Sequence, residues 1–131
     1  MAGEAPSWTV YEDDQTQAFM DINPATEGHT LVVPKVHATD LFHLPEEVAA
    51  AMWRTVRTVG ERAMTAFQAN GLNVLMANRH AAFQTVFHAH VHVIPRYRID
   101  ELHLPWIPRA GDRARIEANG RRLREALGGE D

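Results

Sequence analysis

Polar and apolar positions alternate in the first third of the chain, as they do in short half-buried strands. Residues 8–11 (WTVY) are β-branched or aromatic, and residues 17–21 (QAFMD) alternate polar with apolar side chains. A third run, residues 29–33 (HTLVV), stops at Pro34, which has no N–H for a strand ladder. Because turn-forming residues separate the three runs, the pattern predicts an antiparallel meander.

Through the middle of the chain, apolar residues recur every three or four positions and predict one face of a helix. Pro45 and the acidic pair Glu46 and Glu47 favour a helix start at that point. The Asn70-Gly71 pair predicts the end, because glycine takes the left-handed cap conformation without strain. The stripe consists of Val48, Met52, Val56, Val59, Ala63 and Phe67.

The second half of the chain predicts two more strands and a second helix. Residues 72–77 (LNVLMA) and 86–94 (VFHAHVHVI) are strand-like, and a polar turn between them suggests a hairpin. Residues 98–112 hold two prolines and a glycine and are predicted to be irregular. Residues 113–127 predict a terminal helix, which Gly120 weakens by about 1 kcal/mol.

Composition supports one ordinary globular domain. The 131 residues are 45% hydrophobic and 23% charged, which is normal for a soluble fold. No apolar run is long enough to span a membrane, and the first residues lack the order of a signal peptide, so a cytoplasmic protein is expected. The overall prediction is an α+β fold in a single domain, residues 1–131: a five-stranded antiparallel sheet, one long helix packed on it and a C-terminal helix.

Charge and cysteine content exclude several classes of function. The formal net charge is −4 and no basic stripe with interleaved aromatics exists, so we expect no nucleic-acid partner. The absence of cysteine excludes disulfides, thiol nucleophiles and zinc sites built from thiolates. The unusual feature that remains is the presence of eight histidines.

Three of these histidines form the pattern H-x-H-x-H. His88, His90 and His92 alternate with small apolar residues, so on a strand they share one face. With this composition the pattern arises by chance in roughly 3% of sequences. One chemistry that suits such a face is metal binding, with His29 or Asp21 as a further ligand. The other is nucleophilic attack on phosphorus by a neutral imidazole, with its neighbours stabilising charge. Spacing alone leaves both open.

The sequence around the histidines resembles the histidine triad (HIT) family of nucleotide hydrolases and transferases. Residues 84–96 read QTVFHAHVHVIPR, and residues 19–37 read FMDINPATEGHTLVVPKVH. Residues 3–14 (GEAPSWTVYEDD) look like the family's first strand region. The resemblance covers about residues 3–98, with residues 99–131 as a C-terminal extension. The third histidine, His92, favours the Hint-like and bacterial Hit-like branches, because hexose-1-phosphate nucleotidylyltransferases carry glutamine there.

This resemblance implies a HIT-like fold and a hydrolase of the phosphoramidase type that acts at the α-phosphate of a purine nucleotide. His90 would be the nucleophile, and a covalent nucleotidyl-histidine would be hydrolysed to a nucleoside monophosphate, AMP. His88 and His29 would orient the site, and His92 would contact the phosphate and the bridging region. The resemblance also implies a homodimer in which the long helix and a strand meet across a two-fold axis, and a mechanism without metal or cofactor.

The resemblance also implies which residues bind the substrate. Gln84 and Thr85 would hydrogen-bond the phosphate or the leaving group. Asp21 would accept from the ribose hydroxyls, because a carboxylate is an acceptor for both of them. Phe19 and Ile22 would flank the base. Apart from the family, Asp21 is equally a turn former, and Phe19 a core residue.

Two departures from the family pattern affect the substrate range. Relatives usually carry asparagine where this chain has Ala77, and Asn78 follows one position later. Either Asn78 reaches the site through a shifted loop or that contact is lost. Phe83 replaces a common glycine, and its ring either narrows the leaving-group side or packs elsewhere. The alternatives are a dinucleoside polyphosphate hydrolase, a nucleotide-binding module without catalysis, and a metal-binding protein.

Overall fold

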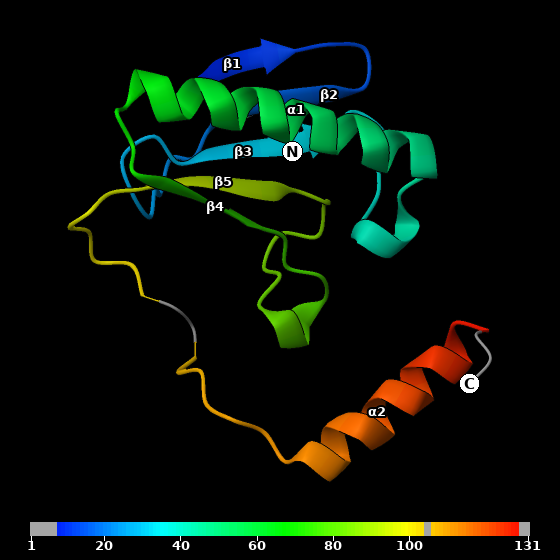
Figure 1. Ribbon diagram of the computed structural model, residues 1–131. Helices are drawn as coiled ribbons and strands as arrows, with labels where there is room; N and C mark the ends of the chain where they lie inside the picture. The colour runs from blue at the N-terminus through cyan, green and yellow to red at the C-terminus, as the bar shows by residue number, and fades with distance from the viewer. Residues whose placement is uncertain (1–7, 104–105, 129–131) are drawn as a thin grey trace.

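Five strands form one antiparallel sheet with the order β1-β2-β3-β5-β4 (Figure 1). The computed structural model describes residues 8–103 and 106–128. The predicted α+β fold is confirmed, including the meander of the first three strands. The strands are β1 (Thr9–Glu12), β2 (Thr16–Met20), β3 (Thr30–Pro34), β4 (Gly71–Leu75) and β5 (Val91–Arg96).

The long helix α1 (Glu46–Ala66) covers one face of the sheet and makes the core with it (Figure 1). Every member of the predicted stripe from Val48 to Ala63 is buried. Burying a valine or methionine side chain contributes about 1.5–3 kcal/mol, so this interface is the main source of stability. The central cluster joins Ala18, Val32, Val91 and Val93 of the sheet to Met52, Val56 and Val59 of the helix.

The end of α1 differs from the prediction. The helix stops at Ala66, the left-handed residue is Gln68 with φ 53°, and Gly71 instead begins β4. Asn70 belongs to the sheet end, because its N–H donates to the Arg96 carbonyl at 2.8 Å. The Asn70-Gly71 pair therefore marks the start of the next strand, and not the cap of the helix.

The strand predicted over residues 86–94 was wrong in its first half. β5 begins at Val91, so of the three triad histidines only His92 lies on a strand. β5 pairs with β3 from Thr30↔Val93 to Val32↔Val91, and the ladder stops at Val32↔Val91. Two positions further along β3 is Pro34, which has no N–H to continue the ladder. The predicted hairpin of β4 and β5 is present, but a long excursion with the short 3-10 helix η2 (His80–Ala82) replaces the polar turn.

The C-terminal helix α2 (Arg113–Ala126) stands away from the sheet (Figure 1). Asp112 caps it by accepting the Arg115 N–H at 3.0 Å, and none of its residues is buried. The described parts of residues 98–112 hold no helix or strand, as predicted. Within the described residues, no helix combines the length and the apolar character needed to cross a membrane. A second short 3-10 helix, η1 (Leu41–His43), precedes α1.

Candidate active site

The loop between β2 and β3 holds His29 in a fixed position. Thr26 donates its hydroxyl to the Pro95 carbonyl at 2.6 Å, and the Tyr97 hydroxyl donates to the Glu27 carbonyl at 2.6 Å. Gly28 has φ +90°, and a Cβ there would lie 2.7 Å from the Phe67 ring. Glycine is therefore required at this position for two reasons: the positive φ angle, and the lack of room for a Cβ beside the Phe67 ring. His29 follows directly and is buried.

His92 lies on β5, between β3 and the edge strand β4, and faces the side of the sheet that α1 leaves open. Its neighbours Val91 and Val93 point into the core, so the His92 side chain points to the other face. Leu31 of β3 pairs with His92 on one side and with Phe19 of β2 on the other. An apolar row therefore leads from the histidine across the sheet to Phe19, one of the two residues expected to flank a base.

The nucleophile candidate His90 is held by the backbone just before β5. Its Nδ1–H donates to the His88 carbonyl at 2.7 Å, because a carbonyl oxygen can only accept. In the neutral ring the lone pair is then on Nε2, for which no partner exists among the described residues. The rings of His90 and His92 lie 5.1 Å apart, centroid to centroid, in an edge-on arrangement. The His88 Nε2–H donates to the Pro34 carbonyl at 3.3 Å.

The tautomer of His92 is set by a chain of hydrogen bonds that begins at a backbone amide. The Ala25 N–H donates to His29 Nδ1 at 2.9 Å, so the proton of neutral His29 is on Nε2. His29 Nε2–H in turn donates to His92 Nδ1 at 2.9 Å. His92 therefore carries its own proton on Nε2 and can donate it. His29 contacts His92 rather than His88, with which the sequence reasoning had grouped it.

Burial favours the neutral forms of His29, His88 and His92. It lowers the pKa of His92 to about 4, with smaller contributions from charge on His90 and His29. Burial also lowers the pKa of His29, although the Asp21 carboxylate partly opposes it, and burial likewise lowers the pKa of His88. A neutral imidazole has one nitrogen with a lone pair, which can attack or accept, and one N–H, which can donate. The hydrogen bonds assigned to these three rings therefore hold near neutral pH.

These lowered pKa values predict that acid destabilises the fold before its carboxylates titrate. The unfolded chain's histidines take up protons near pH 6.5, whereas folded His92 does so only near pH 4. Between these values the unfolded state binds more protons, so stability falls as the pH falls. We expect the free energy of unfolding to drop by about 1 kcal/mol from about pH 7 to about pH 5, because half-exposed rings are partly screened. Urea unfolding at the two pH values measures it; His92→Asn should flatten the slope, and a wild type with constant stability would contradict the assignment.

Asp21 has two tasks. Its Oδ1 accepts the Asn23 N–H at 2.8 Å, which closes the turn, and its Oδ2 lies 3.4 Å from His29 Nε2. Asp21 therefore forms the turn and also lies beside the candidate histidines. Ile22 beside it is 60% exposed and has room for an apolar ligand group.

Gln84 is a correction to the sequence-based expectation. Its side chain is 1% exposed, and its Nε2 donates to the Thr39 carbonyl at 2.6 Å and to the Val86 carbonyl at 3.0 Å. Its Oε1 accepts the Arg79 N–H at 2.6 Å. Both amide hydrogens are used, so Gln84 fixes the loop instead of binding a phosphate. Thr85, next to it, is exposed and remains a candidate.

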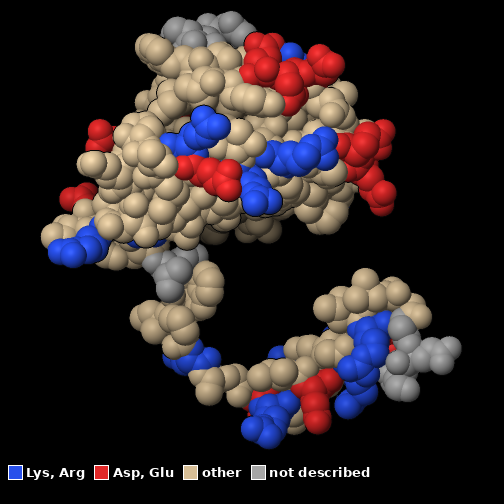
Figure 2. Space-filling view, turned by 45° about the horizontal axis from the view of Figure 1, so that its top comes forward, with Lys and Arg blue, Asp and Glu red and all other residues tan. Residues whose placement is uncertain are grey.

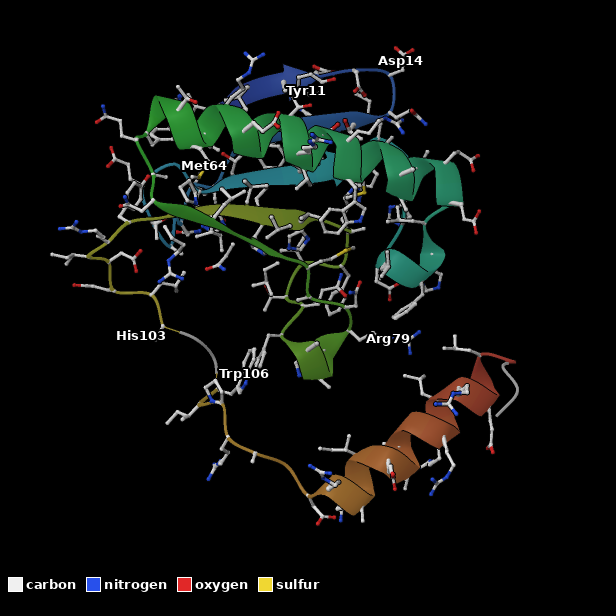
Figure 3. All side chains as sticks on the ribbon, viewed as in Figure 1. Tyr11, Asp14, Met64, Arg79, His103 and Trp106 are labelled. Atoms are coloured by element: carbon white, nitrogen blue, oxygen red, sulfur yellow. The ribbon has the colours of Figure 1, made fainter. Side chains whose placement is uncertain are left out.

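The loop that carries Gln84 is held at a second point, by Asp40. This carboxylate is 2% exposed and lies 2.7 Å from His43 Nδ1 and 3.6 Å from Arg79 Nε. Figure 3 labels Arg79, whose guanidinium also lies 5.1 Å from the centre of the Phe42 ring. The hydrogen bond from His43 is the main reason why the pKa of Asp40 lies below its usual value. Sequence reasoning missed Asp40, because a lone Asp before a short 3-10 helix carries no pattern.

The two departures from the family pattern have clear structural outcomes. Asn78 does not reach the histidines: its Oδ1 accepts the Leu41 N–H at 2.8 Å. Phe83 is in the left-handed region, with φ 72°, and its side chain is 87% exposed. A bulky residue is strained there, which explains why glycine suits this position. Among the residues that the structure describes, the ring has no close packing that would offset the strain.

The group Asp21, His29 and His92 does not fit a metal ion in this arrangement. Each offers one ligand atom, and these atoms lie within 4.8 Å of one another. A metal would need the lone pair of His29 Nε2, which carries the proton because Nδ1 accepts the Ala25 N–H. Metal binding by His29 would therefore require that backbone hydrogen bond to break.

Comparison with known proteins finds relatives of this chain both in sequence and in structure. A family model described as "HIT domain" matches residues 2–99. An uncharacterized HIT-like protein of Mycobacterium tuberculosis is 42% identical over the whole of this chain, which covers 91% of that relative. The adenylylsulfatase HINT3 of Arabidopsis thaliana is 39% identical over 75% of this chain and 50% of its own length. A crystal structure of a Streptococcus mutans protein superposes with a TM-score of 0.88 and 36% identity, over 95% of this chain and 80% of that one.

Proposed function

Because the chain belongs to the histidine triad (HIT) family, we propose that it is a cytoplasmic nucleotide hydrolase that forms a covalent nucleotidyl-His90 intermediate and releases AMP. A role of the nucleotide-binding and hydrolase type follows from membership of the family. The observation that supports the finer proposal is the pairing of His90, whose Nε2 lone pair is open, with His92, whose Nε2 carries a proton.

The reaction has two balanced steps. The lone pair of His90 Nε2 attacks the α-phosphorus, the N–P bond forms, and the bond to the leaving group breaks with its electron pair on that group. His92 Nε2–H donates to the bridging atom as charge develops there. The positive charge on the phosphorylated ring is stabilised by the His88 carbonyl, which keeps the Nδ1–H. Water then attacks phosphorus and gives its proton to the solvent, from which the departed leaving group takes one up; the N–P bond breaks with its electron pair returning to His90 Nε2, and AMP leaves.

The open sheet face supplies a place for the nucleoside. The row from His92 through Leu31 to Phe19 gives an apolar surface for the base, and Ile22 lies beside Asp21 at its edge. In this proposal Asp21 accepts from the ribose hydroxyls through Oδ2, the oxygen that its turn leaves free. Thr85 is the remaining candidate to donate to the phosphate.

One screen tests the reaction and separates the alternatives. AMP release is measured from an adenosine phosphoramidate, an acyl adenylate and a diadenosine polyphosphate. Release from the phosphoramidate is the expected result, and preferential cleavage of the diadenosine compound would identify a dinucleoside polyphosphate hydrolase. Tight AMP binding without release from any compound would contradict catalysis and favour a nucleotide-binding module.

Asp21→Asn should weaken substrate binding more than chemistry. The variant keeps the turn, because an amide oxygen can still accept the Asn23 N–H, but it loses the negative charge and one acceptor. We expect KM to rise about tenfold, the equivalent of about 1.4 kcal/mol, with kcat changed less than about twofold. Asp14→Asn, in the exposed β1–β2 turn, is the matched control. An unchanged KM would leave Asp21 as a turn former only.

We further propose that the enzyme is a homodimer that uses the β4 edge. β4 is an outer strand without proline, and its side chains Val74 and Leu75 are 38% and 55% exposed. Such an edge has free backbone groups that can pair with another chain. On α1, Trp53 is 48% exposed, which would extend the same interface.

A further inference from the structure

The edge strand β1 keeps its apolar side chains outside the core. α1 packs on β2, β3, β4 and β5, whereas all four residues of β1 are exposed. Gly60 holds the helix close to β4, because a Cβ there would lie 2.8 Å from the Leu72 side chain. Figure 1 shows β1 at the outer edge of the sheet, beyond the helix. Val10 and Tyr11, the latter labelled in Figure 3, are therefore 54% and 36% exposed.

A pocket lies between β1 and the second half of α1. Its volume is about 480 Å³. Small-molecule sites in proteins usually measure about 300–1,000 Å³ and have mostly apolar walls. Two of the lining residues on the helix are alanines, and their short side chains leave the gap open. The apolar part of the lining consists of Val10, Met20, Val59, Ala63, Ala66 and Phe67.

The rim of the pocket offers a cation and a hydroxyl group. Arg62 and Thr58 are exposed lining residues one helical turn apart, so they lie on the same side of α1. Glu61, next to Arg62 in sequence, lies 3.5 Å from Arg57 instead. Within the part of the chain that the structure describes, Arg62 has no acidic group at ion-pair distance.

The charge around the pocket selects the sign of a ligand. Figure 2 turns the β1 side of the molecule toward the viewer and shows basic side chains over the middle of this face, with most acidic groups nearer its margins. The lining of the pocket includes no acidic residue, so a cationic ligand would find no partner there. An anionic group at the rim would meet the guanidinium of Arg62, which can hold a carboxylate through two parallel N–H donors.

We propose that this pocket binds a small apolar carboxylic acid of the medium-chain fatty acid type, with its chain inside and its carboxylate on Arg62. The chain would cover the exposed apolar groups of Val10 and Tyr11, which gives the driving force. The pocket is on the α1 side of the sheet, and His92 points to the other side. The site is therefore separate from the proposed reaction, and neither proposal depends on the other.

Octanoate is the probe, and its position is measured on the whole chain by NMR with ¹³C-labelled alanine and leucine methyl groups. We expect a Kd below about 1 mM, with saturable shifts of the Ala63 and Ala66 methyl signals. The Leu31 methyl signals, on the histidine face, should not move. Shifts confined to Leu31, or no binding up to about 10 mM octanoate, would overturn the site.

A matched pair of variants tests the cavity. Ala66→Trp places a large ring in the pocket, and Ala50→Trp places the same ring on an exposed part of α1 that does not line it. We expect the Kd of octanoate to rise at least about tenfold for Ala66→Trp and to stay within about twofold for Ala50→Trp. Equal affinity in both variants and wild type would overturn the site.

A second pair tests the charge, and it decides even if Ala66→Trp fails to fold, because both residues are exposed. Arg62→Gln should raise the Kd of octanoate at least about fivefold, whereas Arg57→Gln should change it less than about twofold. 1-Octanol has the same chain without the charge, so its Kd should be the same in both variants. Unchanged octanoate binding by Arg62→Gln would overturn the assignment of a carboxylic acid.

Discussion

Replacing His90 by alanine is expected to lower the turnover of an adenosine phosphoramidate by more than about 10⁴-fold. The imidazole is the proposed nucleophile, and its ring lies 5.1 Å, centroid to centroid, from the ring of His92, the proposed donor. AMP affinity should change little, because the contacts proposed for the base and the ribose lie across the sheet at Phe19 and Asp21. Rapid-quench measurement of AMP release, with calorimetric titration of AMP, separates these two effects.

His80→Ala is the matched control for the His90 variant. His80 is an exposed histidine in η2, on the same excursion between β4 and β5, and has no proposed role in the reaction. We expect its turnover to match wild type. With radiolabelled nucleotide, wild type should trap an acid-labile protein-bound phosphate that His90→Ala lacks. Full activity of His90→Ala would exclude covalent catalysis at this residue.

Replacing Gln84 by alanine is expected to be the most destabilising single change in the loop before β5. The Arg79 N–H and the carbonyls of Thr39 and Val86 would lose their partner in a region closed to water. Unpaired buried groups and the cavity together cost about 3 kcal/mol, or about 10 °C in Tm for a domain of this size. Thermal unfolding followed by circular dichroism measures it.

The same variant should also lose activity, because Gln84 fixes the backbone that leads to His88 and His90. Gln17→Ala is the control, since its exposed side-chain bond to Thr9 at 3.0 Å should contribute less than about 1 kcal/mol. If Gln84→Ala kept its Tm but raised KM, Gln84 would bind substrate after all. A fall in both Tm and kcat is the result expected of a structural residue.

Local pattern was sufficient to predict the elements of the fold. The spacing of Val48, Met52, Val56 and Val59 predicted α1 and its buried face, because helix periodicity and burial are set by neighbours in sequence. The errors lie where distant contacts decide. β5 starts late because Pro34, far away in sequence, cannot extend the ladder. Gly71 begins β4 because Asn70 pairs with Arg96.

The sequence named the residues of the candidate site but not the contacts between them. The family resemblance named His29 and the triad, but it did not reveal that His29 reaches His92 rather than His88. Gln84 and Thr85 are adjacent in the motif, yet one is enclosed by three backbone groups and the other faces solvent. Which neighbour a polar side chain meets depends on loop geometry, and a single sequence does not contain that information.

The hydrogen-bond chain that sets His92 begins at a main-chain atom, the amide of Ala25. Every amino acid except proline supplies that donor, so natural selection at position 25 acts on the path of the loop and not on the identity of its side chain. Alanine scanning leaves such a determinant untouched, because it changes side chains and not the main chain. The orientation of a reactive ring is thus encoded in Gly28, Thr26 and Tyr97, which hold the loop, several bonds away from the chemistry they govern.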